Sequence, residues 1–256
     1  MLNSLKKLTA LFSVILLLNA CASSAEINQQ AALSYTQEIN QVRAQGALDT
    51  SSNTAKRIHK VFHKMVPYAN QENHTGQAFN WEINVIKSEQ LNAWAMPGGK
   101  MVFYTGLVDK LKLNDDEIAV VMGHEMAHAL KEHGKKKVNM GQITGVFAQV
   151  AHIALSTQIG SDASGLVIGV AKDWGLDKPY SRSNETEADE VGLMLMAKAG
   201  YNPQAAPKLW IKMNQATGNS NSALAGLMST HPTNADRQKN LERLMPEAMA
   251  LYRAGN

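Results

Sequence analysis

The stretch VMGHEMAHALKEHG, residues 121–134, decides how the rest of this chain is interpreted. It contains the pattern His-Glu-x-x-His, in which His124 and His128 stand four residues apart and Glu125 follows the first of them. On a helix, positions i and i+4 share a face, so both imidazoles can reach one metal ion. A catalytic zinc site usually takes three protein ligands and leaves the fourth position to water. The pattern therefore predicts part of a metal site, and a third ligand must come from elsewhere in the chain.

The residues on either side of the pattern support a helix. Asn114 is a favourable N-cap, Asp115 and Asp116 stand in the first turn, and Glu117 occupies the capping-box position. Gly134 is a typical residue at which a helix stops. We therefore expect the pattern to lie within one helix, which argues against a chance match. The alternative is a pair of buried histidines bonded to backbone carbonyls.

The nearest candidate for the third ligand is His133. It lies five residues past His128, which turns it well away from the face that carries the pattern. The longer pattern His-Glu-x-x-His-x-x-Gly-x-x-His also fails, because the chain has Lys131 and Gly134 where glycine and histidine are required. We interpret His133 as a structural residue.

The second candidate lies in the acidic segment SRSNETEADEVG, which begins at residue 181. On a helix, Glu185 and Asp189 share a face, whereas Glu187 points to the other side. One face then carries a carboxylate for the ion and, one turn later, another for the N–H of a ligating histidine. The third candidate is His231 in STHPTNADR, which can enter from a loop. The spacing alone leaves Glu185 and His231 both open.

Four ordered motifs resemble a known family. They are HEMAH (124–128), SRxxExxAD (181–189), HPxxxxR (231–237) and the strand–turn–strand stretch NAWAMPGGKMVFYTGL (92–107). Over residues 80 to 240 they are similar to the gluzincin family of CAAX-prenyl-protease-type and HtpX-type metallopeptidases. Without the transmembrane helices of the HtpX type, the chain resembles the periplasmic lipoprotein and soluble branch, some of whose members act in outer-membrane protein quality control.

The resemblance implies one zinc ion per chain with three ligands: His124, His128 and Glu185. It implies that Glu125 is the catalytic base, which takes a proton from the zinc-bound water and passes it to the leaving amine. Asp189 is expected to hold a ligating histidine in place. His231 is expected near the open metal position, where it either stabilises the transition state or caps the zinc at rest. Arg237 is expected to brace this segment, with an exposed helix charge as the alternative.

The N-terminal segment has the features of a targeting signal. Lys6 and Lys7 precede an apolar run over residues 8–18, which is too short for a permanent membrane span. Cys21 is the only cysteine, and LNAC (18–21) resembles the lipobox of bacterial lipoproteins, in which the cysteine is lipidated. We expect a lipid anchor at Cys21, with a cleaved secretory peptide as the alternative. No aspartate follows the cysteine, which favours a periplasmic protein held at the outer membrane.

The remaining chain divides into helices around a short stretch of strands. Apolar periodicity predicts helices over about 26–45, 53–68, 182–199 and 203–217, one after the HPxxxxR motif, and a last one from Pro246. Between 79 and 106 apolar and polar residues alternate around the turn Pro97-Gly98-Gly99, which predicts antiparallel strands. The glycine- and alanine-rich segment 141–171 is interpreted as buried helix and loop, with a mobile plug near the site as the alternative.

Together, the patterns and the resemblance predict an α+β fold. It is a mainly helical zincin-like metallopeptidase domain with a small antiparallel β-sheet and the His-Glu-x-x-His helix. The expected divisions are a lipoprotein signal peptide (1–20), an N-terminal linker and helix (21–52) and a zinc metallopeptidase domain (53–256).

Composition and motif chemistry narrow the expected function. The net charge of +3 comes without a basic stripe interleaved with aromatic residues, so we expect no nucleic-acid partner. We expect a metalloendopeptidase that acts on unfolded, misfolded or misassembled envelope proteins, with the outer-membrane assembly machinery as a further candidate partner. The rival is a non-catalytic metal-containing chaperone or assembly factor. Glu125 favours the enzyme, because metal storage needs ligands only.

Overall fold

The computed structural model describes residues 22–139, 174, 178–218, 226–232 and 234–255. The expected signal segment, Cys21 and the segment 141–171 lie outside these residues. Among the described helices, none combines the length and the apolar character that a membrane span requires.

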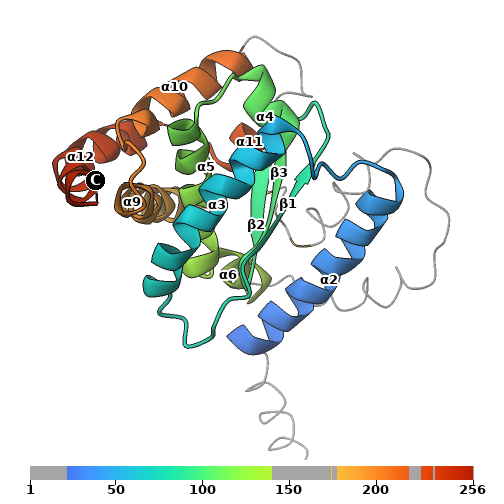
Figure 1. Ribbon diagram of the computed structural model, residues 1–256. Coiled ribbons are helices and arrows are strands. Elements are labelled where there is room, and N and C mark those ends of the chain that lie inside the picture. The colour runs from blue at the N-terminus through green and yellow to red at the C-terminus, as the bar shows by residue number, and fades with distance from the viewer. Residues whose placement is uncertain (1–21, 140–173, 175–177, 219–225, 233, 256) are drawn as a thin grey trace, which may run out of the picture.

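A small sheet forms the centre of the fold (Figure 1). Its strands are β1 (Glu82–Ile86), β2 (Ala93–Met96) and β3 (Lys100–Tyr104), in the spatial order β1-β3-β2. β2 and β3 pair antiparallel across the predicted turn, where Gly98 and Gly99 both have positive φ. β1 pairs parallel with β3. The expectation of a purely antiparallel sheet was therefore wrong: the chain reverses direction twice, and β3 returns beside β1 in the same direction.

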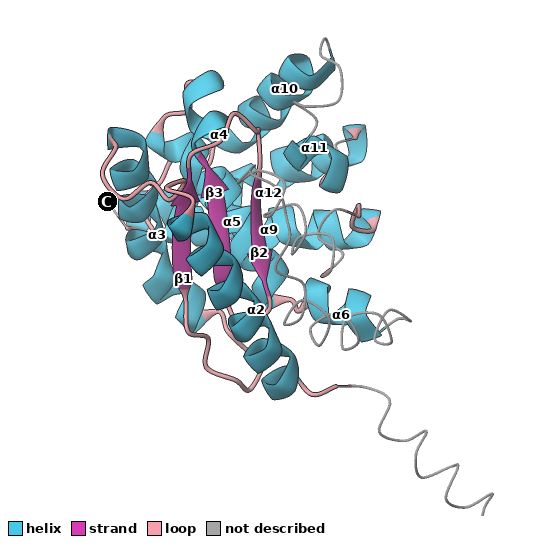
Figure 2. Cartoon of the chain, turned by 90° about the vertical axis from the view of Figure 1, so that its right-hand side faces the viewer, coloured by secondary structure: helices cyan, strands magenta, loops and turns pink. Residues whose placement is uncertain are grey.

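Both faces of the sheet are covered by helices. Alternate residues of each strand point to opposite faces, so each strand contributes to two cores. On one side, Val102 and Tyr104 pack with the helix α2 (Ser24–Ala44). On the other side, Met101 and Phe103 join the larger core with α3 (Asn53–Gln71) and α5 (Asp115–Leu130). Figure 2 shows α2 in front of the sheet and α5 behind it. The N-terminal helix is thus part of the packed fold.

The end of α5 differs from the expectation. Its N-terminus has the predicted capping box, in which Asn114 and Glu117 exchange side-chain and backbone hydrogen bonds of 2.9 Å. After the short helix α4 (Thr105–Lys110), α5 runs only to Leu130, and Glu132 takes a positive φ of 52°. A new helix, α6 (His133–Asn139), then begins. The predicted stop at Gly134 was wrong, because the left-handed backbone at Glu132 ends the helix two residues earlier.

The C-terminal part of the chain is helical. It contains α9 (Arg182–Lys198), α10 (Ala205–Gly218), α11 (Gly226–Thr230) and α12 (Ala235–Ala254). The predicted separate helix from Pro246 was wrong, because α12 continues through this proline with Leu241 and Ala248 buried on either side of it. Burial of one helix face on both sides of the proline offsets the loss of a backbone hydrogen bond and the steric clash of the ring. α9 packs between α5 and α12, and this layer carries the candidate site.

Candidate metal centre

Helices α5 and α9 cross at two glycines. A Cβ atom at Gly123 would lie 2.6 Å from the backbone oxygen of Gly192, and one at Gly192 would lie 2.7 Å from the backbone nitrogen of His124. Any side chain at either position would push the helices apart. The close crossing therefore places the acidic residues of α9, Glu185 and Asp189, against the histidines of α5.

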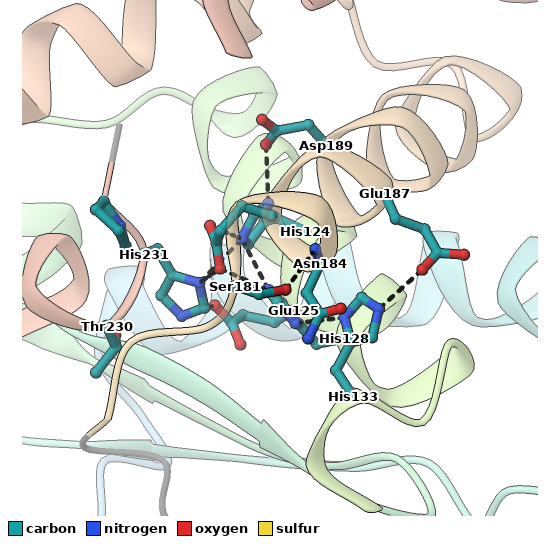
Figure 3. A network of polar contacts seen from close by, with 12 residues as sticks. His124, Glu125, His128, His133, Ser181, Asn184, Glu187, Asp189, Thr230 and His231 are labelled. Atoms are coloured by element: carbon teal, nitrogen blue, oxygen red, sulfur yellow. Dashed lines mark hydrogen bonds and ion pairs between the residues drawn. The ribbon is translucent and has the colours of Figure 1, made fainter. Parts of the chain in front are cut away.

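Four buried side chains from three segments meet at this crossing: His124, His128, Glu185 and His231. One ligand atom from each lies within 4.8 Å of the others. Figure 3 shows His124, His128 and His231 side by side. Nε2 of His124 is 3.1 Å from Nε2 of His128 and 3.1 Å from Nδ1 of His231. The Glu185 carboxylate lies 3.4 Å from both α5 imidazoles and 3.0 Å from the His231 ring.

This set of donor atoms fits a divalent cation. Three imidazole nitrogens and a carboxylate converge in a buried region, and the nitrogen–nitrogen contacts cannot all be satisfied by ring protons. Oε2 of Glu185 has no aligned hydrogen-bond donor, although Nη1 of Arg237 lies 2.9 Å away. Imidazole and carboxylate ligands, four in number, match the preference of zinc.

The electrostatic environment also favours a cation. Burial opposes protonation of His124, but hydrogen bonds to Asp189 and Glu185 outweigh it and raise the pKa of this imidazole to about 9. Burial likewise opposes ionisation of Glu185, but the charge of His231 and hydrogen bonds from the three imidazoles hold the pKa of its carboxyl far below the usual range. The Glu185 carboxylate thus stays ionised within the cluster, and a metal ion can take the place of the proton on His124.

A buried arginine fixes the acidic helix. Arg237 on α12 is only 2% exposed, so the alternative of an exposed helix charge was wrong. Its guanidinium donates to both oxygens of Asp189 at 2.6 and 2.8 Å. Asp189 in turn lies 3.0 Å from Nδ1 of His124. Arg237 and Asp189 therefore hold the His124 ring with its Nε2 toward the cluster, since the ring can rotate only by breaking these bonds.

Glu125 faces the same space from α5. Its side chain is buried, and its Oε1 has no hydrogen-bond partner but lies 3.3 Å from Nε2 of His231. Burial raises the pKa of the Glu125 carboxyl, against the opposing charges of His231 and His124. A buried carboxyl with an unpaired oxygen beside potential metal ligands is suited to exchange a proton with a reactant.

The structure separates the three candidates for the third ligand. Glu185 and His231 both enter the cluster, whereas His133 does not. His133 instead contacts the outer nitrogen of His128, with 2.8 Å between the two Nδ1 atoms. Glu187 points away from the cluster as expected, and its Oε2 lies 3.0 Å from Nε2 of His133.

Sequence reasoning missed Tyr180. Its buried ring stacks on His128 with the centroids 4.0 Å apart, and Nζ of Lys137 lies 3.3 Å from the centre of the tyrosine ring. Its backbone N–H donates to the carbonyl of Thr230 at 3.1 Å. An aromatic residue directly before the N-cap of α9 was the only local signal, and it does not indicate which ring it covers.

Comparison with known proteins places this geometry in a family. Residues 52–245 match the family described as peptidase family M48. The chain belongs to peptidase family M48. The expected resemblance to gluzincin metallopeptidases is thereby confirmed. The chain contains an M48 metallopeptidase domain with a His-Glu-x-x-His site, and its described residues are mainly helical with a small mixed sheet, as the predicted fold class required apart from the direction of β1.

Several M48 proteins are similar to this chain. The mitochondrial metalloendopeptidase OMA1 of Schizosaccharomyces pombe is 37% identical over 168 residues, which cover 66% of this chain and 48% of that protein. Metalloprotease YcaL of Escherichia coli is 25% identical over 199 residues, which cover 76% of this chain and 74% of YcaL. The beta-barrel assembly-enhancing protease of Yersinia pestis is 26% identical over 182 residues, 68% of this chain and 36% of that protein. The match thus spans about half of the first relative and about a third of the last.

Proposed function

We propose that this M48 domain is a zinc-dependent endopeptidase that hydrolyses peptide bonds in unfolded or misassembled envelope proteins. The observation that carries the proposal is the position of Glu125. Its carboxyl is buried, has one oxygen without a hydrogen-bond partner, and adjoins the four potential ligands. Metal storage does not need such a group, whereas peptide hydrolysis needs a base beside the ion.

In this proposal His124, His128 and Glu185 hold the ion. The three come from α5 and α9, whose crossing at the two glycines fixes their spacing. Zinc, when bound there, supplies Lewis-acid polarisation of the scissile carbonyl and lowers the pKa of water.

Glu125 performs the proton transfers. Its ionised carboxylate accepts a proton from the attacking water, and the resulting acid then donates that proton to the amine that leaves. Burial favours the protonated form of this carboxyl, which suits the second transfer. The neighbouring imidazole nitrogen of His231, 3.3 Å away, keeps the ionised form accessible for the first.

His231 has two alternative roles in this scheme. Its Nδ1 lies 3.0 Å from Oε1 of Glu185, among the ligand atoms, so in one role His231 would be a fourth ligand of a bound ion. In the alternative role, the His231 ring would donate a hydrogen bond to the developing oxyanion.

The substrate main chain pairs with β2. This strand is at the edge of the sheet and packs against α5, and the backbone of Ala95 hydrogen-bonds the Glu125 carboxyl. An extended segment added along this edge is held by backbone hydrogen bonds with little regard for sequence. Such recognition suits unfolded proteins, which expose extended main chain.

We further propose that lipidation of Cys21 anchors the domain on the periplasmic side of the outer membrane. The lipobox-like LNAC sequence supports this location. The similarity to a protease named for enhancing β-barrel assembly supports envelope proteins, and contacts with the outer-membrane assembly machinery, as its targets.

The deciding experiment compares wild type with Glu125→Gln in cleavage of casein as an unfolded substrate. The amide keeps the size of the side chain but cannot accept the proton, so cleavage should fall by at least about 100-fold. Zinc content should remain equal in both proteins. If the variant cleaves casein at the wild-type rate, or if chelators leave wild-type cleavage unchanged, the protease proposal is wrong.

A further inference from the structure

His128 makes a contact on its outer side that differs from that of His124. Its Nδ1 lies 2.8 Å from Nδ1 of His133, and Nε2 of His133 lies 3.0 Å from Oε2 of Glu187. His133 is fully buried, whereas the Glu187 side chain is 41% exposed. A line of three polar side chains therefore runs from the cluster to the protein surface (Figure 3).

The direction of these hydrogen bonds follows from the metal role of His128. Nε2 of His128 faces Glu185 and His124, so a bound ion takes the lone pair on that nitrogen. A neutral imidazole then carries its proton on Nδ1, which donates to Nδ1 of His133. His133 must accept with that nitrogen, so its own proton is on Nε2 and is donated to Glu187.

The two histidines of α5 are thus oriented by different partners. His124 donates to Asp189, a buried carboxylate held by Arg237. His128 has no carboxylate within reach on its outer side among its described contacts, and a neutral imidazole occupies that place instead. The carboxylate at the end of this line is Glu187, which lies on another face of α9 from Asp189 and contacts His133.

We propose that His133 and Glu187 are positioning residues that fix the tautomer and ring orientation of His128 for metal binding. This inference rests on the proposed metal role of His128. The left-handed backbone at Glu132, which ends α5, makes this positioning possible. With α5 ended at Leu130, α6 can turn His133 back toward His128, which a continuous helix would not allow.

A packing role alone does not explain the geometry. A buried histidine that only fills space needs its two nitrogens satisfied by any partners, such as backbone carbonyls. Here both nitrogens of His133 are engaged by side chains, one on a potential ligand and one on a carboxylate. We therefore expect that substitution of His133 lowers metal affinity more than it lowers the stability of the fold.

The test measures zinc affinity by competition with a chromogenic chelator, together with thermal unfolding and the visible spectrum of the cobalt-substituted protein. His133→Leu keeps the volume but removes the acceptor, and the Kd for zinc should rise about 10-fold or more. His133→Asn retains an oxygen that can accept the His128 proton and should restore most of the affinity. Both variants should remain folded.

Glu187 is tested in the same way. Glu187→Gln keeps an acceptor for the His133 proton and should stay near wild type, whereas Glu187→Leu should weaken zinc binding in the same direction as His133→Leu but by less. Glu190→Gln is the matched control on the same helix, because its contacts are with Asn240 and Arg243 on α12. It should leave affinity unchanged.

The experiment distinguishes failure of the metal site from failure of the positioning role. If wild type binds no zinc, the proposed function fails before the variants are considered. If wild type binds zinc and His133→Leu, folded, binds it equally well, the positioning role is wrong while the metal site stands. Equal losses in the leucine and asparagine variants would also overturn it, because they would show that packing and not the acceptor matters.

Discussion

Gly123 and Gly192 bring the backbones of α5 and α9 into direct contact at the level of the candidate site. A Cβ at Gly123 would come within 2.6 Å of the Gly192 carbonyl oxygen, a distance that only movement of a helix could relieve. His124 follows Gly123, so that the closest point of the crossing adjoins a potential ligand. Site geometry and helix packing are therefore set by the same two residues.

Gly192→Ala is expected to damage both stability and metal binding. The added methyl group meets backbone atoms on α5, which cannot rotate away, so the free energy of unfolding should fall by about 1–3 kcal/mol or more. Thermal unfolding and zinc titration measure the two effects. Gly134→Ala is the control, because a Cβ there meets only the ring of Pro97 at an ordinary 3.4 Å. An unchanged Gly192→Ala protein would contradict the close crossing.

Glu185→Ala and Glu187→Ala compare the proposed ligand with a glutamate two positions later that points away from the cluster. Removal of Glu185 deletes the only carboxylate of the cluster, so zinc content after dialysis should fall nearly to zero. Removal of Glu187, which is not a ligand in this assignment, should leave zinc content near one per chain after the same dialysis. Elemental analysis of the purified proteins decides this. Equal loss in both, or loss in the Glu187 variant alone, would overturn the ligand assignment.

Arg237→Ala is expected to be strongly destabilising. It leaves Asp189 and Glu185 as buried charges without their cation, a change that costs about 3–5 kcal/mol in other buried pairs. Chemical denaturation gives the free energy of unfolding. Arg243→Ala on the same helix serves for comparison, because its side chain is 63% exposed and, among the described residues, pairs with the partly exposed Glu190 and with Asn240. This control should lose about 1 kcal/mol or less. Similar losses in both would contradict the buried role of Arg237.

Asp115 predicts a pH dependence of stability away from the site. Burial opposes its ionisation, but hydrogen bonds from Arg57 and Lys60 hold the pKa of its carboxyl below 3.8. Because the folded pKa lies below the unfolded value, the ionised group stabilises the fold above the unfolded pKa, and this contribution is lost as the pH falls through the folded pKa.

Asp115→Asn should therefore lower the free energy of unfolding by about 1 kcal/mol or less at neutral pH, since the pair is partly exposed. The difference from wild type should shrink toward about pH 3. Urea unfolding at both pH values measures it. Asp236→Asn, in the first turn of α12, controls for a negative charge at a helix N-terminus. A difference that grows on acidification would show that the sign is wrong.

Local patterns were sufficient for most of the helices and strands. The capping box at Asn114, the turn at Pro97-Gly98-Gly99 and the start of α9 all followed from short-range preferences of the backbone. The pairing of β1 with β3 did not, because the direction of a neighbour in a sheet depends on how the chain returns and not on the strand sequence. The continuous α12 was missed because a proline inside a helix is tolerated only when tertiary packing holds both sides.

What the sequence determined by itself was the chemistry: the i, i+4 histidines with Glu125 between them, and the carboxylate pair Glu185 and Asp189, belong to helices whose period places them on shared faces. Only the tertiary structure decided which groups meet. The position of His231 among the ligands and the burial of Arg237 depend on residues distant in sequence. The contact of His133 depends on the end of α5 at the left-handed Glu132. Helical periodicity does not indicate contacts of either kind. The crossing at Gly123 and Gly192 turns those separate helix faces into one site, because only residues without side chains allow the two backbones to approach so closely.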